Sequence, residues 1–210
     1  MPTLILIPTV LEAKLLFPKP VTGQVRMALC GFSLAIAGTR AAELLSREKY
    51  ERVLLLGIAG SLDVDAAPIG SAHSFSSVRV DGLGCGEGAR FEDARALKMP
   101  LFTGEDGADK EPLFDELALA GPGAAALLSV ASAAGSPEEA LRRRRRHPTV
   151  IAEDMEAFAV AFACARAGVP LHVVRGISNI AGERDKDEWR VKPALEAAKS
   201  MALGLLGLER

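Results

Sequence analysis

The chain has 210 residues, 25% of them charged, and a formal net charge of −2, which gives no general attraction to nucleic acid or to an anionic membrane. The first eight residues lack a basic leader, and no apolar run is long enough for a signal peptide or a bilayer span, so we expect a cytoplasmic protein without a membrane partner. The dispersed cysteines Cys30, Cys85 and Cys164 have no metal-ligand spacing, which favours reduced thiols and no metal site.

The first part of the chain predicts alternating strands and helices. Short apolar runs bounded by proline or glycine indicate buried strands, and Thr39 can cap a helix. The expected elements are a strand at 4–7, a hairpin at 24–37 around Gly31, a helix at 39–49, a strand at 53–56, and two strands or one bent strand at 69–80. Residues 81–110 are rich in Gly, Asp and Glu and have little periodicity, so we expect a mobile loop there.

The second part of the chain continues the alternation. Ser136 followed by Pro137 is typical of a helix start, and Gly168 is suited to end a helix. The expected elements are a strand at 127–133, a helix from Ser136, a helix at 153–168, a strand at 171–177, and a final helix capped by Asp187 with Pro193 in its early turns.

Continuous apolar strands separated by amphipathic helices indicate an α/β fold in which helices cover both faces of a sheet. Several strands end in glycine or polar residues, which predicts a binding site at one edge of that sheet.

Two short stretches carry the strongest functional signal. Glu153-Asp154-Met155-Glu156 opens the helix predicted at 153–168, and Arg175-Gly176-Ile177-Ser178-Asn179 closes the next strand, so the two stretches could face one pocket. Glu153 and Asp154 could also be ordinary caps of a helix N-terminus. Glu156 lies at the margin of the packed helix face, where a carboxylate needs partners because burying an unpaired charge is costly.

Together these stretches resemble the C-terminal signature of the nucleoside phosphorylase/nucleosidase superfamily, which carries Met-Glu on a helix and Arg-x-x-Ser-Asp/Asn after the next strand. The residues of these two stretches are most similar to those of the futalosine hydrolase family of menaquinone biosynthesis. Pro8 to Glu12 and Gly57 to Gly60 follow the expected order. The resemblance implies one nucleosidase domain over 1–210, a three-layer α/β/α fold with a mixed central sheet, a purine nucleoside substrate, no cofactor, and a homo-oligomer.

The resemblance also implies roles for single residues. Glu12 would deprotonate the attacking water, Glu156 would grip the ribose hydroxyls, and Asn179 would contact the leaving base. Substrate binding is expected at Met155, Ser178, Arg175, Gly60, Ala133 and Ala134. Without the resemblance, Glu12 would be interpreted as a first-turn residue of a surface helix and Asn179 as a turn asparagine.

Asn179 bears on the choice of base. Adenine-specific nucleosidases of the superfamily generally have Asp at this position, whereas an Asn amide can donate to both N7 and O6 of a 6-oxopurine. We therefore expect hydrolysis of futalosine with release of hypoxanthine. A nucleosidase for methylthioadenosine and adenosylhomocysteine remains the leading alternative.

Two further alternatives are a purine nucleoside phosphorylase and a non-catalytic nucleoside-binding protein. Phosphorylases of the superfamily bind phosphate with an Arg two residues before the glycine turn and a Ser after its first glycine. Here Leu55 and Ile58 occupy those positions, so water is the expected nucleophile.

Some basic residues have no role in the proposed reaction. The run Arg142 to Arg146 is expected to be a solvated helix end rather than a nucleic-acid patch. His73 and His172 lack partners at metal-ligand spacing. The distal carboxylate of futalosine needs a cation, for which the candidates are Arg79, Arg90, Lys98 and Arg184.

Overall fold

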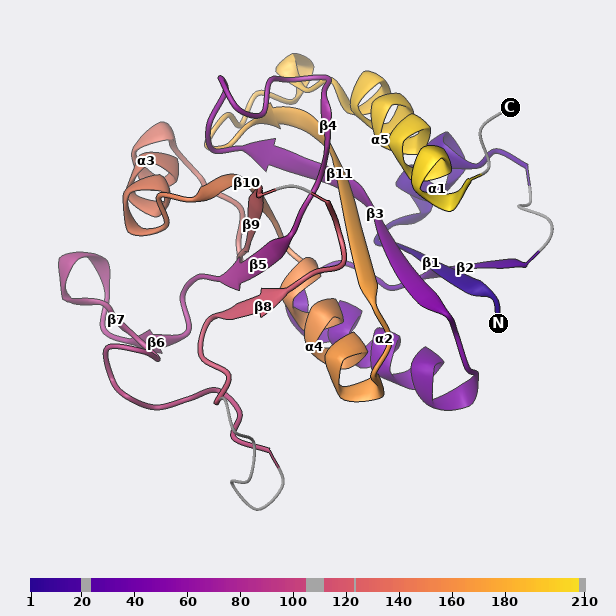
Figure 1. The fold of residues 1–210 in the computed structure, drawn as a ribbon. Coiled ribbons are helices and arrows are strands. Elements are labelled where there is room, and N and C mark those ends of the chain that lie inside the picture. Colours follow the sequence, from indigo (N-terminus) through magenta and orange to yellow (C-terminus); the bar gives the residue numbers. More distant parts are fainter. Residues whose placement is uncertain (20–23, 105–111, 123, 208–210) are drawn as a thin grey trace.

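The computed structural model describes residues 1–19, 24–104, 112–122 and 124–207. Its main sheet follows the order β2-β1-β3-β10-β9-β5-β8, with β11 paired to β3 and β4 (Figure 1). The strands of this sheet are β1 (Thr3–Ile7), β2 (Val25–Leu29), β3 (Arg52–Ser61), β4 (Ala72–Ser74), β5 (Ser77–Val80), β8 (Glu116–Ala118), β9 (Ala126–Ser129), β10 (Val150–Asp154) and β11 (Leu171–Ile180).

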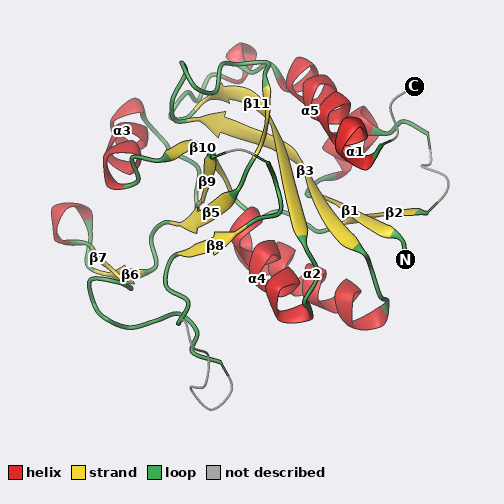
Figure 2. Cartoon of the chain, viewed as in Figure 1, coloured by secondary structure: helices red, strands yellow, loops and turns green. Residues whose placement is uncertain are grey.

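Helices cover both faces of the sheet, as Figure 2 shows. The helices α2 (Leu34–Arg47) and α4 (Ala157–Ala167) pack together on one face, and α1 (Val10–Leu16) and α5 (Val191–Leu206) pack together on the other. The helix α3 (Pro137–Arg146) lies beside β10. This arrangement confirms the predicted three-layer fold.

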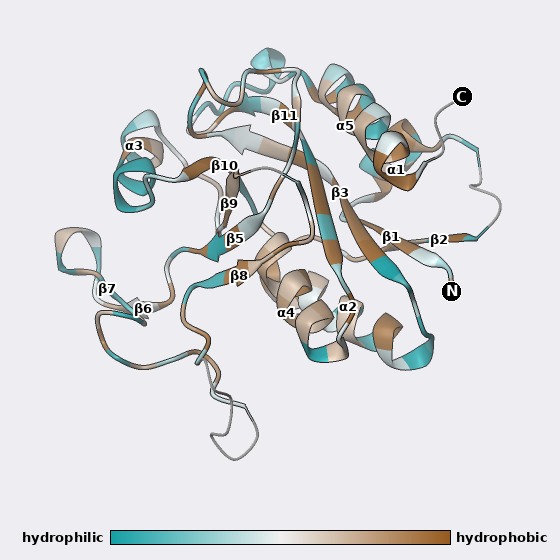
Figure 3. Cartoon of the chain, in the orientation of Figure 1, coloured by the Kyte–Doolittle hydropathy of each residue, from teal (hydrophilic) through white to brown (hydrophobic). Residues whose placement is uncertain are grey.

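The alternation of β3 side chains explains the three layers. Successive side chains of a strand point to opposite faces. Val53 and Leu55 accordingly lie in the core under α2 and α4, whereas Leu54 and Leu56 lie in the core under α1 and α5. Both faces must be covered, so the strand is a continuous apolar run, which is visible in Figure 3.

The sheet is mixed, as expected. β1 and β11 run parallel to β3, whereas β10 runs antiparallel to β3 and pairs with its last residues only. This reversal brings the ends of β3, β10 and β11 together at one edge, in line with the site predicted there.

The hairpin expected at 24–37 is wrong. β2 pairs parallel with β1, and 34–47 form one helix whose buried residues Ala37, Ala41 and Leu44 recur at helical spacing. Thr39 therefore lies inside α2 and does not cap it.

Two helix starts also differ from the prediction. The helix expected from Glu153 begins at Ala157, because 150–154 extend the sheet as β10. The final helix is not capped by Asp187, which lies in the short 3-10 helix η3 (Lys186–Glu188), and Arg190 occupies the N-cap position of α5.

The expected loop at 81–110 contains some regular structure. A small pair of strands, β6 (Gly84–Cys85) and β7 (Glu92–Asp93), flanks a 3-10 turn, η1 (Gly88–Arg90). Residues 105–110 of this segment lie outside the described residues.

Two helix ends match the prediction. The Ser136 side chain accepts a hydrogen bond from the Glu139 backbone N–H at the start of α3, and Gly168 ends α4 with φ at 66°. A left-handed φ is accessible to glycine without steric cost.

Candidate active site

A cavity of about 480 Å³ opens at the edge where β3, β10 and β11 end. Eight of the nine predicted catalytic and substrate-binding residues line it: Glu12, Gly60, Ala133, Ala134, Met155, Glu156, Ser178 and Asn179. The ninth, Arg175, is fully buried behind this wall and contacts two of its carboxylates. Residues from opposite ends of the chain therefore meet around one space.

Arg175 on β11 organises the acidic side of the cavity. Its Nη2 donates to Asp154 Oδ2 at 2.5 Å and to Glu156 Oε2 at 3.0 Å, and its Nε donates to the same Asp154 oxygen at 3.1 Å. Asp154 also accepts hydrogen bonds from the Ser129 hydroxyl and from the Ala157 backbone N–H. Buried charges need such dense pairing, because removing a single partner leaves an uncompensated ion.

Glu156 occupies the N-cap position of α4 and is 5% exposed. Burial raises its pKa from an ordinary value of 4.5 to about 7; Arg175 opposes this shift, and Asp154 adds to it by like-charge repulsion. The Ser33 backbone N–H, at the start of α2, lies 3.4 Å from the other carboxylate oxygen. The carboxyl group therefore changes protonation near neutral pH.

Glu12 lies in the first turn of α1 but is only 4% exposed, so it is not the surface residue expected of a helix start in isolation. Thr9 caps the helix by accepting from the Glu12 backbone N–H, and its hydroxyl donates to Glu12 Oε2 at 2.5 Å. The Ile58 backbone N–H donates to Glu12 Oε1 at 3.1 Å. These contacts fix the carboxylate against the cavity wall.

The Ile58 backbone also bears on the nucleophile. Its N–H is occupied by Glu12, and its side chain supplies no hydroxyl group. Leu55, where the phosphorylases place a cation, is fully buried in the core under α2 and α4. Two positions that phosphorylases use for phosphate are therefore apolar here.

Asn179 follows a register shift in the pairing of β11 with β3. The Ser178 hydroxyl lies 2.8 Å from Asn179 Oδ1, and Asn179 Nδ2 donates to the Ile180 carbonyl at 2.9 Å. Ser178 therefore fixes the amide with its oxygen turned toward the hydroxyl and its NH₂ group on the other side.

The segment with Ala133 and Ala134 connects β9 to α3 and is held by two residues that have no role in the sequence-based prediction. Glu153 accepts a hydrogen bond from the Ala134 backbone N–H at 2.8 Å, and it also lines the cavity. Arg143, 8% exposed, donates to Glu153 at 2.6 Å and to the Ser132 carbonyl at 2.9 Å.

The interpretation of 142–146 as a solvated helix end is therefore wrong for Arg143. Arg144 pairs with Asp63, and Arg146 pairs with Asp81. Salt bridges to the protein's own carboxylates thus occupy three of the five arginines, and the run is not a free basic patch.

His73 has a neighbour of its own, since it lies 2.8 Å from the Ser71 hydroxyl. Within the described ranges, no group of three or more acidic, histidine or cysteine side chains could hold a metal ion. No helix in the part of the chain that the structure describes is both long and apolar enough to cross a bilayer.

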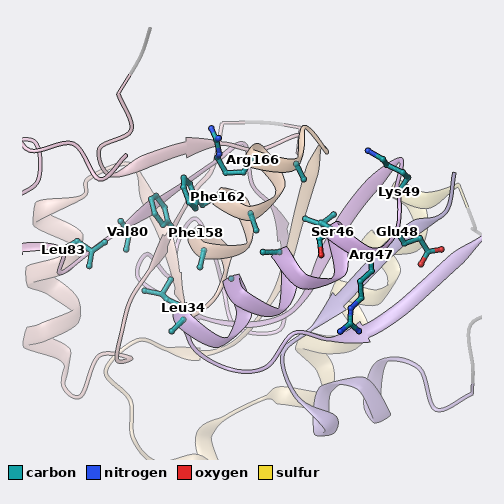
Figure 4. Close-up of a pocket in the computed structure, with 17 residues that line it drawn as sticks. Leu34, Ser46, Arg47, Glu48, Lys49, Val80, Leu83, Phe158, Phe162 and Arg166 are labelled. Carbon is teal, nitrogen blue, oxygen red and sulfur yellow. The ribbon is translucent and has the colours of Figure 1, made fainter. Parts of the chain in front are cut away.

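A second, larger cavity of about 900 Å³ lies over α2 and α4 (Figure 4). Leu34, Phe158 and Phe162 contribute apolar surface to it, and Arg166 lies at its margin, 4.7 Å from the Phe102 ring. No sequence-predicted site residue lines this groove.

Comparison with protein families supports the identity that the signature implies. The model of the phosphorylase superfamily matches residues 86–206. Futalosine hydrolase of Streptomyces coelicolor is 34% identical over 162 residues, which cover 77% of this chain and 67% of that protein. Futalosine hydrolase of Thermus thermophilus is 31% identical over 98% of this chain and 96% of that protein, whereas the alignment with the Acidothermus cellulolyticus enzyme covers 62% of the relative.

Solved structures agree on the fold. The 5'-methylthioadenosine/S-adenosylhomocysteine nucleosidase of Helicobacter pylori, with butyl-thio-DADMe-Immucillin-A, has a TM-score of 0.76 at 17% identity and covers 99% of this chain and 98% of its own. Native futalosine hydrolase of the same organism has a TM-score of 0.75 at 16% identity, over 99% of this chain and 97% of its own. The chain therefore belongs to the phosphorylase superfamily and, within it, to the futalosine hydrolase family.

Proposed function

We propose that this chain hydrolyses the N-glycosidic bond of futalosine, releasing hypoxanthine and dehypoxanthinyl futalosine in menaquinone biosynthesis, with water as the nucleophile. Two proteins that are 34% and 31% identical to this chain are futalosine hydrolases. The single observation that carries the proposal is the convergence of Glu12, Glu156 and Asn179 on one cavity. Breaking a ribosyl–purine bond needs stabilisation of the cationic sugar, a base for the water, and a donor to the leaving group.

The acidic side of the cavity suits the sugar. Glu156 would accept hydrogen bonds from the ribose hydroxyls and, when ionised, stabilise the positive charge that develops on the ring. Met155, beside it on the cavity wall, offers apolar contact to the sugar and base. Arg175 acts through Glu156, because it holds that carboxylate without lining the cavity.

Glu12 would orient the water and take its proton. The carboxylate is anchored through Thr9 and the Ile58 backbone N–H, which leaves it little freedom to turn away. Water rather than phosphate is favoured because the positions that bind phosphate in phosphorylases are Leu55 and Ile58 here.

Asn179 would donate to the departing base. Ser178 holds the amide oxygen and one amide N–H donates to the Ile180 carbonyl, so the other N–H is available to an acceptor such as N7 or O6 of hypoxanthine. Gly60 lies beside this amide, since a side chain built on it would lie 3.6 Å from Asn179 Nδ2.

We also propose a cytoplasmic homo-oligomer of single-domain subunits. The apolar groove over α2 and α4 is the face that a second copy would cover. Exposed apolar patches of this kind are typical of protein interfaces.

The purified protein should be offered futalosine, methylthioadenosine and inosine, each with and without phosphate, and the freed base identified chromatographically. We expect hypoxanthine from futalosine without any need for phosphate. Strict dependence on phosphate would support a phosphorylase, and preferred release of adenine would support the methylthioadenosine nucleosidase alternative.

A further inference from the structure

Glu153 is a cavity residue for which the reaction outlined above has no use. It lies on β10 directly opposite Gly60 of β3, and Asn179 of β11 lies opposite the same Gly60 on the other side. Both side chains line the cavity, Glu153 with 4% and Asn179 with 9% exposure. Gly60 therefore lies between Glu153 and Asn179 in the sheet, and both residues line the same cavity.

The carboxylate of Glu153 is tied to the segment that contains Ala133 and Ala134, where substrate binding is expected. One oxygen accepts from the Ala134 backbone N–H at 2.8 Å, and the other accepts from Arg143 at 2.6 Å. Arg143 also donates to the Ser132 carbonyl, which clamps both sides of the segment. An ionised carboxylate offers about four lone-pair positions, so these contacts leave acceptor capacity on each oxygen.

The two purine classes differ where such an acceptor matters. A 6-oxopurine carries a hydrogen on N1 next to the acceptor O6, whereas adenine has an acceptor N1 next to a donor amino group. Asn179 offers a donor, and Glu153 offers only acceptors while it is ionised. This order, donor then acceptor, complements O6 and N1–H and repels the bare N1 of adenine.

We propose that Glu153 is a specificity-determining residue that accepts the N1–H of a 6-oxopurine, so that Glu153 and Asn179 together select the base. This inference rests on the proposed function, since it concerns the base of the same substrate. It assigns to Arg143 a positioning role: Arg143 balances the charge of Glu153 and fixes its direction.

The test is the selectivity of Glu153→Gln, a replacement of equal size without the charge. We expect kcat/KM for futalosine to fall by roughly 10- to 100-fold, as for loss of a hydrogen bond to a charged group. With the analogue that carries a 6-amino purine, kcat/KM should stay level or rise, because the Gln amide can donate to N1. An equal fall for both substrates, or no change for either, would overturn the inference.

Glu139→Gln is the matched control. Glu139 contacts Arg143 at 2.7 Å and the Gly135 backbone N–H at 2.8 Å but does not line the cavity. The substitution loosens the same segment without altering the cavity carboxylate, so both substrates should change by a common factor. A selectivity shift as large as that of Glu153→Gln would assign the effect to the loop and refute our inference.

A binding measurement needs no variant and separates the two proposals. We expect titration calorimetry to show that the wild-type protein binds hypoxanthine more tightly than adenine. It should also bind hypoxanthine more tightly than 1-methylhypoxanthine, which lacks the N1 hydrogen. Equal affinities would refute the role of Glu153 even if futalosine is hydrolysed. Conversely, if no base is released from futalosine, the proposed function fails, while a preference for hypoxanthine would still support recognition of N1–H.

Discussion

Glu12 and Arg175 approach each other across the bare α-carbon of Gly57. A Cβ atom built on Gly57 would lie 2.7 Å from Glu12 Oε1 and 2.4 Å from Arg175 Nη1. That nitrogen is buried and has no hydrogen-bond partner among the described residues. Two charged groups that belong to different walls of the site therefore share the space that the glycine leaves open.

Gly57→Ala should disable the site while leaving the fold in place. The added methyl group must displace Arg175 or Glu12, and Arg175 is too deeply buried to retract. We expect turnover to fall by at least roughly tenfold and the free energy of unfolding to fall by about 1–3 kcal/mol, as for overpacking in a core. Gly135→Ala is the control, because its Cβ would make only an ordinary contact at 3.5 Å.

Glu12→Gln should remove the base that activates water. The replacement keeps an oxygen to accept from the Ile58 N–H, and its NH₂ group can donate to the Thr9 hydroxyl oxygen, so the protein should unfold cooperatively as before. We expect kcat to decrease by roughly 10²- to 10⁴-fold, the usual contribution of general base catalysis. Steady-state kinetics on futalosine would check this, and a variant that retains a tenth of the activity would contradict the assignment.

Glu156→Gln should stabilise the protein, and more so at high pH, because Asp154 remains to balance the charge of Arg175. Burial raises the pKa of Glu156 to about 7, so the folded state binds this proton more tightly than the unfolded chain does. The stability that depends on this proton is complete below pH 4.5 and is lost as the pH rises through 7. A glutamine side chain cannot ionise and avoids that loss.

At pH 8 the Glu156→Gln variant should therefore exceed the wild type in free energy of unfolding by on the order of 3 kcal/mol, and at pH 5 by much less. Urea unfolding at both pH values measures the difference. Glu196→Gln, at an exposed position of α5, should show no such pH dependence. An equal effect of Glu156→Gln at both pH values would show that its ionisation is not what limits stability.

Asn179→Asp should shift base selectivity toward 6-amino purines. A carboxylate at this position repels O6, and a protonated carboxyl can serve N7 while accepting from an amino group. We expect the ratio of kcat/KM values for futalosine over the 6-amino analogue to fall by at least roughly tenfold, as for loss of one polar contact. An unchanged ratio would remove Asn179 from the specificity machinery.

Arg184 is the candidate cation for the distal carboxylate of the substrate. Of the four candidate cations, Arg184 lines the cavity, and Lys186, which was not a candidate, lines it too. Arg79 instead forms salt bridges with Asp115 and Glu116. Arg184→Met should raise KM for futalosine by roughly tenfold and leave inosine, which lacks that arm, unaffected. Arg90→Met is the control, and equal effects on futalosine and inosine would contradict the role.

The parts of the fold that the sequence predicted well are those with a single strong determinant. The central strands β3 and β11 are covered on both faces, and their continuous apolar runs therefore indicated buried strands. The cavity residues were found because the signature marks two short stretches on neighbouring elements, and the structure brings both to the same sheet edge.

The start of α2, expected at Thr39 but found at Leu34, shows where local patterns fail. Glycines such as Gly38 weaken a helical pattern in isolation. In the structure Gly38 faces Ala159 of α4, where a Cβ would come within 2.9 Å, so the glycine permits the two helices to pack closely. Gly38 is therefore explained by a tertiary contact between α2 and α4, which the local sequence around Gly38 does not reveal.

Arg143 was missed for a similar reason. Within the arginine run, the neighbouring side chains have the same chemistry, and only helix orientation decides which one is buried. For Glu153, its partner, a cap remained an open alternative because the start of the next helix was placed too early.

Glu156 connects the starts of two helices. It occupies the N-cap position of α4, and its carboxylate faces the backbone N–H of Ser33, the N-cap residue of α2, whose φ of 93° is rare outside glycine. Both helices that line the large groove thus start at the same acidic group. If Glu156 binds the nucleoside as proposed, a partner whose docking moves these helix starts would alter affinity for the nucleoside, and by thermodynamic reciprocity the nucleoside would alter affinity for that partner by the same factor.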